Sequence, residues 1–142
     1  MPYRYLEDVA IADLAFEAEG ESLNQLFSEA VLALTAAMVE PDTLKGREKC
    51  RLSAGADELD TLLFRTLSEA VLMKDAEQLL FLPEHAEIVQ TEAGYKAVVE
   101  GKCDRIDPKR QKLRTDVKAV TLHDLSVGQK SGKWVCRVTL DV

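Results

Sequence analysis

The sequence lacks the features of a membrane protein, of a disulfide-rich secreted protein and of a zinc protein. Its 142 residues contain no apolar run of the roughly 18 residues that a membrane span requires, and its start does not have the charged and then apolar layout of a signal peptide. The three cysteines, Cys50, Cys103 and Cys136, lie far apart without a C-x-x-C pair, so we expect thiols rather than metal ligands. We therefore expect one cytoplasmic domain over residues 1–142, in which 46% hydrophobic residues can bury a core.

Signatures of common enzyme classes are missing as well. The chain has no P-loop, no G-x-S-x-G nucleophile elbow and no Cys/His pair. Its two histidines, His85 and His123, have no partner at a metal-ligand spacing such as H-x-x-x-H. We expect His85 at the surface and His123 as a hydrogen-bonded residue on the buried face of a strand.

Charge is distributed unevenly along the chain. The net charge of −7 argues against a surface that binds polyanions as a whole. Residues 102–114 are the exception, because they contain six basic residues and only two acidic ones. This segment is either a solvated loop of mixed charge or a docking surface for an acidic partner or RNA. No aromatic residues alternate with these charges, which argues against direct binding of single-stranded RNA.

Two amphipathic helices are predicted from apolar residues that recur every three to four positions. The first begins at Ser22, which forms a capping box with Gln25, and its pattern stops at Pro41. The second begins near Asp57 and ends near Lys74 and Asp75. Each helix has one apolar stripe and therefore needs a sheet to cover.

Strands are predicted in the intervals between and after the helices, roughly over residues 9–18, 49–53, 79–89, 94–101, 116–127 and 133–142. Short turns join the last of these runs. This pattern favours an α+β domain, in which a mixed or antiparallel sheet carries both helices on one face. It argues against a doubly wound fold.

The first predicted strand changes phase near its middle. Val9 and Ile11 alternate in one phase, whereas Leu14 and Phe16 alternate in the other. The change at Ala12–Asp13 has two interpretations. Either a β-bulge redirects the Asp13 side chain, or the strand begins at Asp13 and the preceding residues form an arm.

The end of the chain places two carboxyl groups on adjacent residues, the side chain of Asp141 and the terminal carboxylate of Val142. Such hard oxygen ligands hold Ca²⁺ or Mg²⁺. A five-residue loop, Gly128–Gly132, would pair the last two strands so that Lys118 faces Val142. Alternation along the last strand places Asp141 on the more polar face, and it places these residues on the core face: Trp134, Cys136, Val138 and Leu140.

Taken together, these residues resemble the archease family over nearly the whole of residues 1–142. The resemblance is carried by Asp13 with Gly20–Leu23 and Leu26–Phe27, by Leu59, Leu62 and Leu63, by Val117–Thr121 with His123, and by Asp141–Val142. It implies a helix-on-sheet domain of the SHS2 type. It also implies a divalent metal, often calcium, held by Asp13, Asp141 and the carboxylate of Val142.

The resemblance further implies a role in tRNA splicing and RNA repair. Archeases are cytosolic partners of the RtcB-type RNA ligase, which they help to form its guanylate intermediate and to turn over repeatedly. Lys118 matches a lysine important to that activity, and RNA would be met only through the ligase. Two family histidines are absent, since Val9–Ala12 precedes Asp13 and Gln111 precedes the Val117–Thr121 segment.

Three functional classes remain open from the sequence. The first is a non-enzymatic accessory protein that presents a metal site to the ligase. The second is a small metal-dependent hydrolase, because carboxylates that hold a divalent ion can activate water. The third is a general chaperone or a modulator of an RNA-modifying enzyme. A hydrolase would act alone, whereas an accessory protein would be inert until its enzyme is added.

Overall fold

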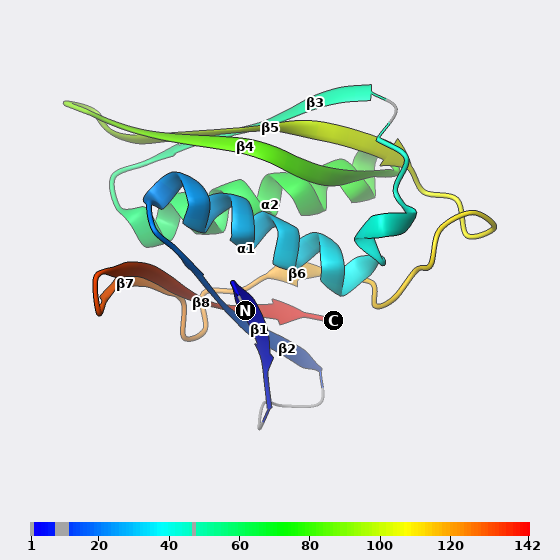
Figure 1. Ribbon diagram of the computed structural model, residues 1–142, viewed down its shortest axis with the longest axis horizontal. Helices are drawn as coiled ribbons and strands as arrows, with labels where there is room; N and C mark the ends of the chain where they lie inside the picture. The colour runs from blue at the N-terminus through cyan, green and yellow to red at the C-terminus, as the bar shows by residue number, and fades with distance from the viewer. Residues whose placement is uncertain (1, 8–11, 47) are drawn as a thin grey trace.

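The structure is a computed structural model that describes residues 2–7, 12–46 and 48–142. It has three layers, with two helices between two antiparallel sheets (Figure 1). The elements in chain order are β1 (Tyr3–Leu6), β2 (Asp13–Gly20), α1 (Leu23–Met38), the short 3-10 helix η1 (Pro41–Thr43), β3 (Glu48–Ala56), α2 (Leu59–Glu77), β4 (Leu79–Thr91), β5 (Gly94–Arg105), β6 (Ala119–Val120), β7 (Ser126–Lys130) and β8 (Lys133–Asp141).

The two sheets share no strand. One has the order β1-β2-β8-β6, with β7 pairing β8 beside β6, and the other has the order β3-β5-β4. The predicted α+β class with antiparallel strands and two helices is confirmed. The prediction of a single sheet is corrected, because there are two sheets and each helix contacts strands of both. Alternation of apolar residues indicates where strands lie, but it does not indicate which strands pair.

Local sequence signals set the ends of α1. The Ser22 hydroxyl accepts a hydrogen bond from the Gln25 backbone N–H at 3.1 Å, and the Gln25 side chain accepts one from the Glu21 N–H at 2.6 Å. The helix ends at Met38, ahead of Pro41. The predicted Ser22 cap and the stop are thus confirmed, whereas Gln25 reaches back to the Glu21 N–H and not to that of Ser22. Gly20 is needed where β2 meets this helix, because an added Cβ would lie 2.6 Å from the Leu26 backbone nitrogen.

The core lies between the layers and explains why the helices are so deeply covered. Every residue from Ala33 to Met38 is buried, which small alanines allow where a sheet lies on either side. The largest fully buried side chains include Phe16 and Leu140 from one sheet, Phe81 and Leu52 from the other, and Leu26, Phe27, Leu34, Leu62, Leu63 and Leu67 from the helices. Among the described residues, neither helix combines the length and apolar character that a membrane crossing requires.

Two strand predictions need correction. Residues 116–127 were expected to form one strand, but only Ala119–Val120 and Ser126–Lys130 are extended, and a loop over residues 121–125 separates them. His123 lies in this loop and is exposed, so the expected buried histidine is wrong. Asp124 in the loop has a φ of 53°, a left-handed conformation that interrupts an extended strand. β1 was not predicted.

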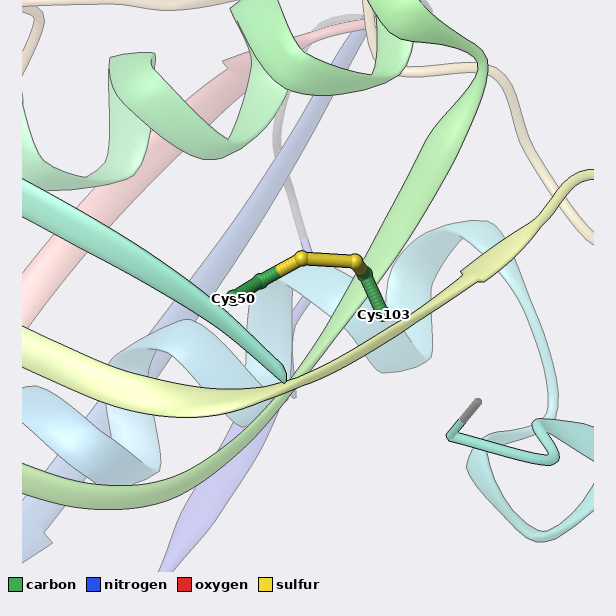
Figure 2. Close-up of a disulfide and its surroundings, with 2 residues drawn as sticks. All are labelled: Cys50 and Cys103. Atoms are coloured by element: carbon green, nitrogen blue, oxygen red, sulfur yellow. A yellow bond between two sulfur atoms is a disulfide. The ribbon is translucent and has the colours of Figure 1, made fainter. Parts of the chain in front are cut away.

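The cysteine prediction is also corrected for two of the three residues. Cys50 of β3 and Cys103 of β5 form a disulfide with a Cα–Cα distance of 5.9 Å (Figure 2). Antiparallel pairing of β3 with β5 brings these distant sequence positions together, which their spacing alone does not reveal. Cys136 is a free, buried thiol, as expected. Burial raises its pKa to about 12.

Candidate functional site

The predicted site lies where β2, β8 and β6 meet. Asp13 and Asp141 are direct cross-strand partners in the β2–β8 pairing. The Val142 N–H donates to the Ala12 carbonyl at 3.0 Å, so the neighbouring Asp13–Asp141 pair occupies a non-hydrogen-bonded position of the ladder. Side chains at such a position lie on the same face and approach most closely, with Cα atoms about 4.5 Å apart. The two carboxylates are therefore neighbours.

The start of β2 favours one of the two interpretations of the phase change. β2 begins at Asp13, and Ala12 lies in a turn. This agrees with a strand that starts at Asp13. Residues 9–11 of the predicted strand lie outside the described residues.

Lys118 joins the site from the other side of β8. Ala119 of β6 is the cross-strand partner of Asp141, and the Lys118 N–H donates to the Asp141 carbonyl at 2.8 Å. The Lys118 side chain is exposed. Asp141 is thus flanked by Asp13 on one strand and by the Lys118–Ala119 segment on the other.

The register at this point was predicted correctly although the predicted loop was not. The turn between β7 and β8 has two residues, Ser131 and Gly132, and both have positive φ, as the hairpin turn of type I′ requires. The predicted five-residue loop is wrong. The loop over residues 121–125 absorbs the difference, so Ala119 still pairs with Asp141, the register that brings Lys118 to the chain end as expected.

Thr139 of β8 is a further residue near the carboxylate pair. It lies two residues before Asp141 and hence on the same side of β8. Its side chain is 2% exposed, and its hydroxyl has no hydrogen-bond partner among the described residues. The Thr121 hydroxyl and N–H both donate to the Thr139 carbonyl and not to this hydroxyl. A buried hydroxyl without a partner costs about 1–3 kcal/mol, so this oxygen is suited to a ligand near the carboxylate pair.

The basic segment 102–114 is organised around one buried acid. Asp104 accepts hydrogen bonds from the Lys45 backbone N–H at 2.9 Å, from Arg110 at 2.8 and 3.0 Å and from Gln111 at 3.0 Å. The Arg110 hydrogen bonds are the main cause of a pKa for Asp104 well below its ordinary range. Gln111 is buried and also donates to the Arg105 carbonyl at 2.8 Å. Gln111 therefore holds the loop in shape.

Internal pairing leaves part of the segment's positive charge at the surface. Arg110 pairs with Asp104, and Arg114 pairs with Glu40. The remaining basic side chains are exposed and belong to Lys102, Arg105, Lys109 and Lys112. Docking of an acidic partner on this segment stays a prediction.

A metal site made of three acidic, histidine or cysteine side chains does not occur among the residues that the structure describes. This result is compatible with the predicted ligand set, since Asp13 and Asp141 supply only two such side chains. The third predicted ligand is a main-chain carboxylate, that of Val142. The ligand set stays a prediction.

Comparison with known proteins agrees with the resemblance noted in the sequence. Residues 3–142 match the Archease protein family (MTH1598/TM1083). The archease of Methanopyrus kandleri is 28% identical over 142 residues, covering 100% of both chains. The archease of Pyrococcus abyssi is 27% identical over 132 residues, covering 92% of this chain and 93% of that protein.

Solved structures with a similar fold agree with the sequence comparisons. The solution structure of protein 1598 of Methanobacterium thermoautotrophicum superposes with a TM-score of 0.86 at 25% identity, covering 99% of each chain. A Thermotoga maritima protein, named an archease and possible chaperone, superposes with a TM-score of 0.61 at 19% identity, covering 96% of this chain and 97% of that one. The second likeness concerns the fold alone. Because the family match runs from residue 3 to residue 142, this chain belongs to the archease family.

Proposed function

We propose that this protein is a non-catalytic partner of an RtcB-type RNA ligase, and that it promotes the ligase's guanylylation and multiple turnover in tRNA splicing and RNA repair. The observation that carries the proposal is the cross-strand pairing of Asp13 with Asp141, whose carbonyl accepts the Lys118 N–H. These three positions are the ones that the family resemblance implicates. They come from distant parts of the sequence and meet at one end of one sheet.

A divalent metal, in our proposal calcium, fits the donor set. Two like charges directly opposite each other on a sheet are unfavourable, and a divalent cation between Asp13 and Asp141 would remove the repulsion. The carboxylate of Val142 and the unpartnered hydroxyl of Thr139 would add oxygen donors of the kind that calcium prefers. When bound, the ion would supply positive charge that attracts phosphate oxygens of the ligase-bound nucleotide.

The residues of this chain would bind and orient the ligase-bound nucleotide and would not take part in the chemical step. The exposed Lys118 ammonium extends from the segment that is hydrogen-bonded to Asp141, so it can contact a phosphate oxygen when the ligase docks. The exposed lysines of segment 102–114 would contact an acidic surface of the ligase. RNA would be met through the ligase, and the complex would act in the cytoplasm.

The proposal is tested with three site variants and one control. Asp13→Asn, Asp141→Asn and Lys118→Met should each abolish stimulation of ligase turnover while the protein remains folded. Glu87→Gln changes an exposed acid on the other sheet and should stimulate normally. Full stimulation by all three site variants would refute the proposed site.

Two further measurements separate the proposal from its alternatives. Extending the chain by a Gly-Ser dipeptide converts the Val142 carboxylate into a peptide group and should weaken calcium binding, measured by calorimetry. Hydrolysis of phosphoesters by the protein alone, lost in Asp13→Asn, would instead favour a metal-dependent hydrolase. Stimulation of unrelated enzymes to the same extent would favour a general chaperone.

A further inference from the structure

Lys74 is a buried lysine whose contacts the proposed site does not include. It lies in the last turn of α2 and is 6% exposed. Its ammonium lies 2.6 Å from Asp116 Oδ1, 2.7 Å from the Val117 carbonyl and 2.8 Å from Asp75 Oδ1. The ammonium thus has three oxygen partners within 2.8 Å.

The charge state of Lys74 follows from these contacts. Burial alone would lower the pKa of Lys74, because an ammonium is poorly solvated away from water. The hydrogen bonds to Asp116 and Asp75 outweigh burial, and the pKa is raised above its ordinary value. Lys74 is therefore a permanent cation at neutral pH, and its three acceptors compensate for its desolvation.

Two of the three acceptors belong to the segment that leads into Lys118. The Val117 carbonyl and the Lys118 N–H belong to the same peptide group, which is planar and rigid. Its carbonyl accepts from Lys74 on α2, and its N–H donates to the Asp141 carbonyl on β8. Hydrogen bonds therefore hold this peptide group at its carbonyl from α2 and at its N–H from β8.

We propose that Lys74 is a positioning residue that fixes the 117–118 peptide group and thereby the direction in which the Lys118 side chain leaves the backbone. The functional consequence rests on the proposed function, whereas the conformational consequence does not. Residues 114–118 lie outside any helix or strand, so without Lys74 this peptide group would keep, among the described residues, only its N–H bond to the Asp141 carbonyl. The buried Val117 side chain anchors the segment by packing, but packing alone does not fix the rotation of the adjacent peptide group.

The conformational part is tested by amide hydrogen exchange measured by NMR. Lys74→Met keeps the apolar stem and removes the three donors, and it should speed exchange of the Lys118 amide about tenfold, the effect of losing one hydrogen bond of typical strength. Asp75→Asn is the matched control, since it alters an acceptor of the same ammonium that does not belong to the segment. Unchanged Lys118 exchange in folded Lys74→Met would overturn the proposal.

A second variant keeps the test decisive if Lys74→Met does not fold. Asp116→Ala removes an exposed acceptor of Lys74 and leaves the helix intact, and it should also speed exchange of the Lys118 amide. The Val142 amide, which pairs with Ala12 on the other side of β8, should exchange at its wild-type rate in both variants. An equal increase at the Val142 amide would indicate general loosening and would contradict a specific role.

The functional part uses ligase stimulation with two separate readouts. Lys74→Met should lower the maximum stimulation severalfold, while the half-saturating concentration of the protein and its calcium affinity remain those of the wild type. A parallel loss of calcium affinity would show that Lys74 supports the whole site and would overturn the positioning role. If the wild-type protein does not stimulate the ligase, the proposed function fails, but the exchange measurement still decides whether Lys74 holds the peptide group.

Discussion

Replacing Asp13 by asparagine should change the stability of this protein in opposite directions without and with calcium. The variant keeps the shape of the side chain and removes one of two like charges that face each other across β2 and β8. Like charges in that position are unfavourable by about 0.2–1 kcal/mol. In the presence of a chelator, Asp13→Asn should therefore be as stable as the wild type or more stable, by up to about 1 kcal/mol.

Calcium should reverse this order. A ligand at 100 times its Kd stabilises the folded state by about 2.7 kcal/mol, which for a chain of this size raises the Tm by about 8 °C. The wild type should show a shift of that size, and Asp13→Asn should show little or none. Thermal unfolding followed by circular dichroism, with chelator and with calcium, measures both differences on the same samples.

Two results would contradict the predicted effects of Asp13→Asn. One is an Asp13→Asn variant that is clearly less stable than the wild type in chelator, because the carboxylate pair would then be held by favourable contacts. The other is an unchanged calcium shift in the variant, because the ion would then bind elsewhere. Glu87→Gln, which changes an exposed acid on the other sheet, should behave as the wild type in both conditions.

Three further predictions concern buried polar groups. Asp104→Ala should lower the free energy of unfolding by about 3 kcal/mol in urea titrations, because it leaves buried donors without their acceptor. The folded-state pKa of Asp104 lies below its ordinary 3.8, so its contribution is present above pH 3.8 and is lost as the pH falls through the folded value, a dependence that Asp104→Ala should lack. Thr139→Val should raise stability in chelator by about 1 kcal/mol, because it removes an unsatisfied hydroxyl, and a loss of stability would show that the hydroxyl has a partner. A thiol titration of the oxidised protein should find no reactive group in the folded state at pH 8, since Cys136 is buried with a pKa of about 12, and one thiol after unfolding without reductant.

The features that the sequence predicted well depend on residues close together in the chain. The N-terminus of α1 follows from Ser22 and Gln25, and its end follows from Pro41. Alternation along β8 correctly placed Cys136, Val138 and Leu140 in the core. These patterns are local, because each depends only on a few neighbouring residues.

The features that were missed depend on pairing between distant segments. Nothing in the local pattern of β3, β4 and β5 indicates that they pair only with one another, or that Cys50 and Cys103 meet. The role of Lys74 could not be predicted either, because a lysine in the last turn of a helix usually lies at the surface, where it interacts with the helix dipole. The contact of α2 with the segment before β6 gives this lysine two of its three acceptors.

The candidate site was predicted in part. Three features of the sequence indicated Asp13, Lys118 and Asp141: the change of phase in the first predicted strand, the hairpin expected at the end of the chain, and the family resemblance. The hairpin loop was wrong, but the register beside Asp141 was correct because the loop over residues 121–125 compensates for the shorter turn. Thr139 was not predicted as part of the site, because its burial and its unpartnered hydroxyl depend on the tertiary structure.

The decisive experiment for the proposed function is RNA ligation by a limiting amount of the RtcB-type ligase from the same organism, with GTP and a divalent metal, in the presence and absence of this protein. We predict that the ligase proceeds from a single turnover to many when the wild-type protein is added, and that Asp13→Asn and Lys118→Met do not support this change. Unchanged turnover together with unchanged guanylylation of the ligase would contradict the proposed function.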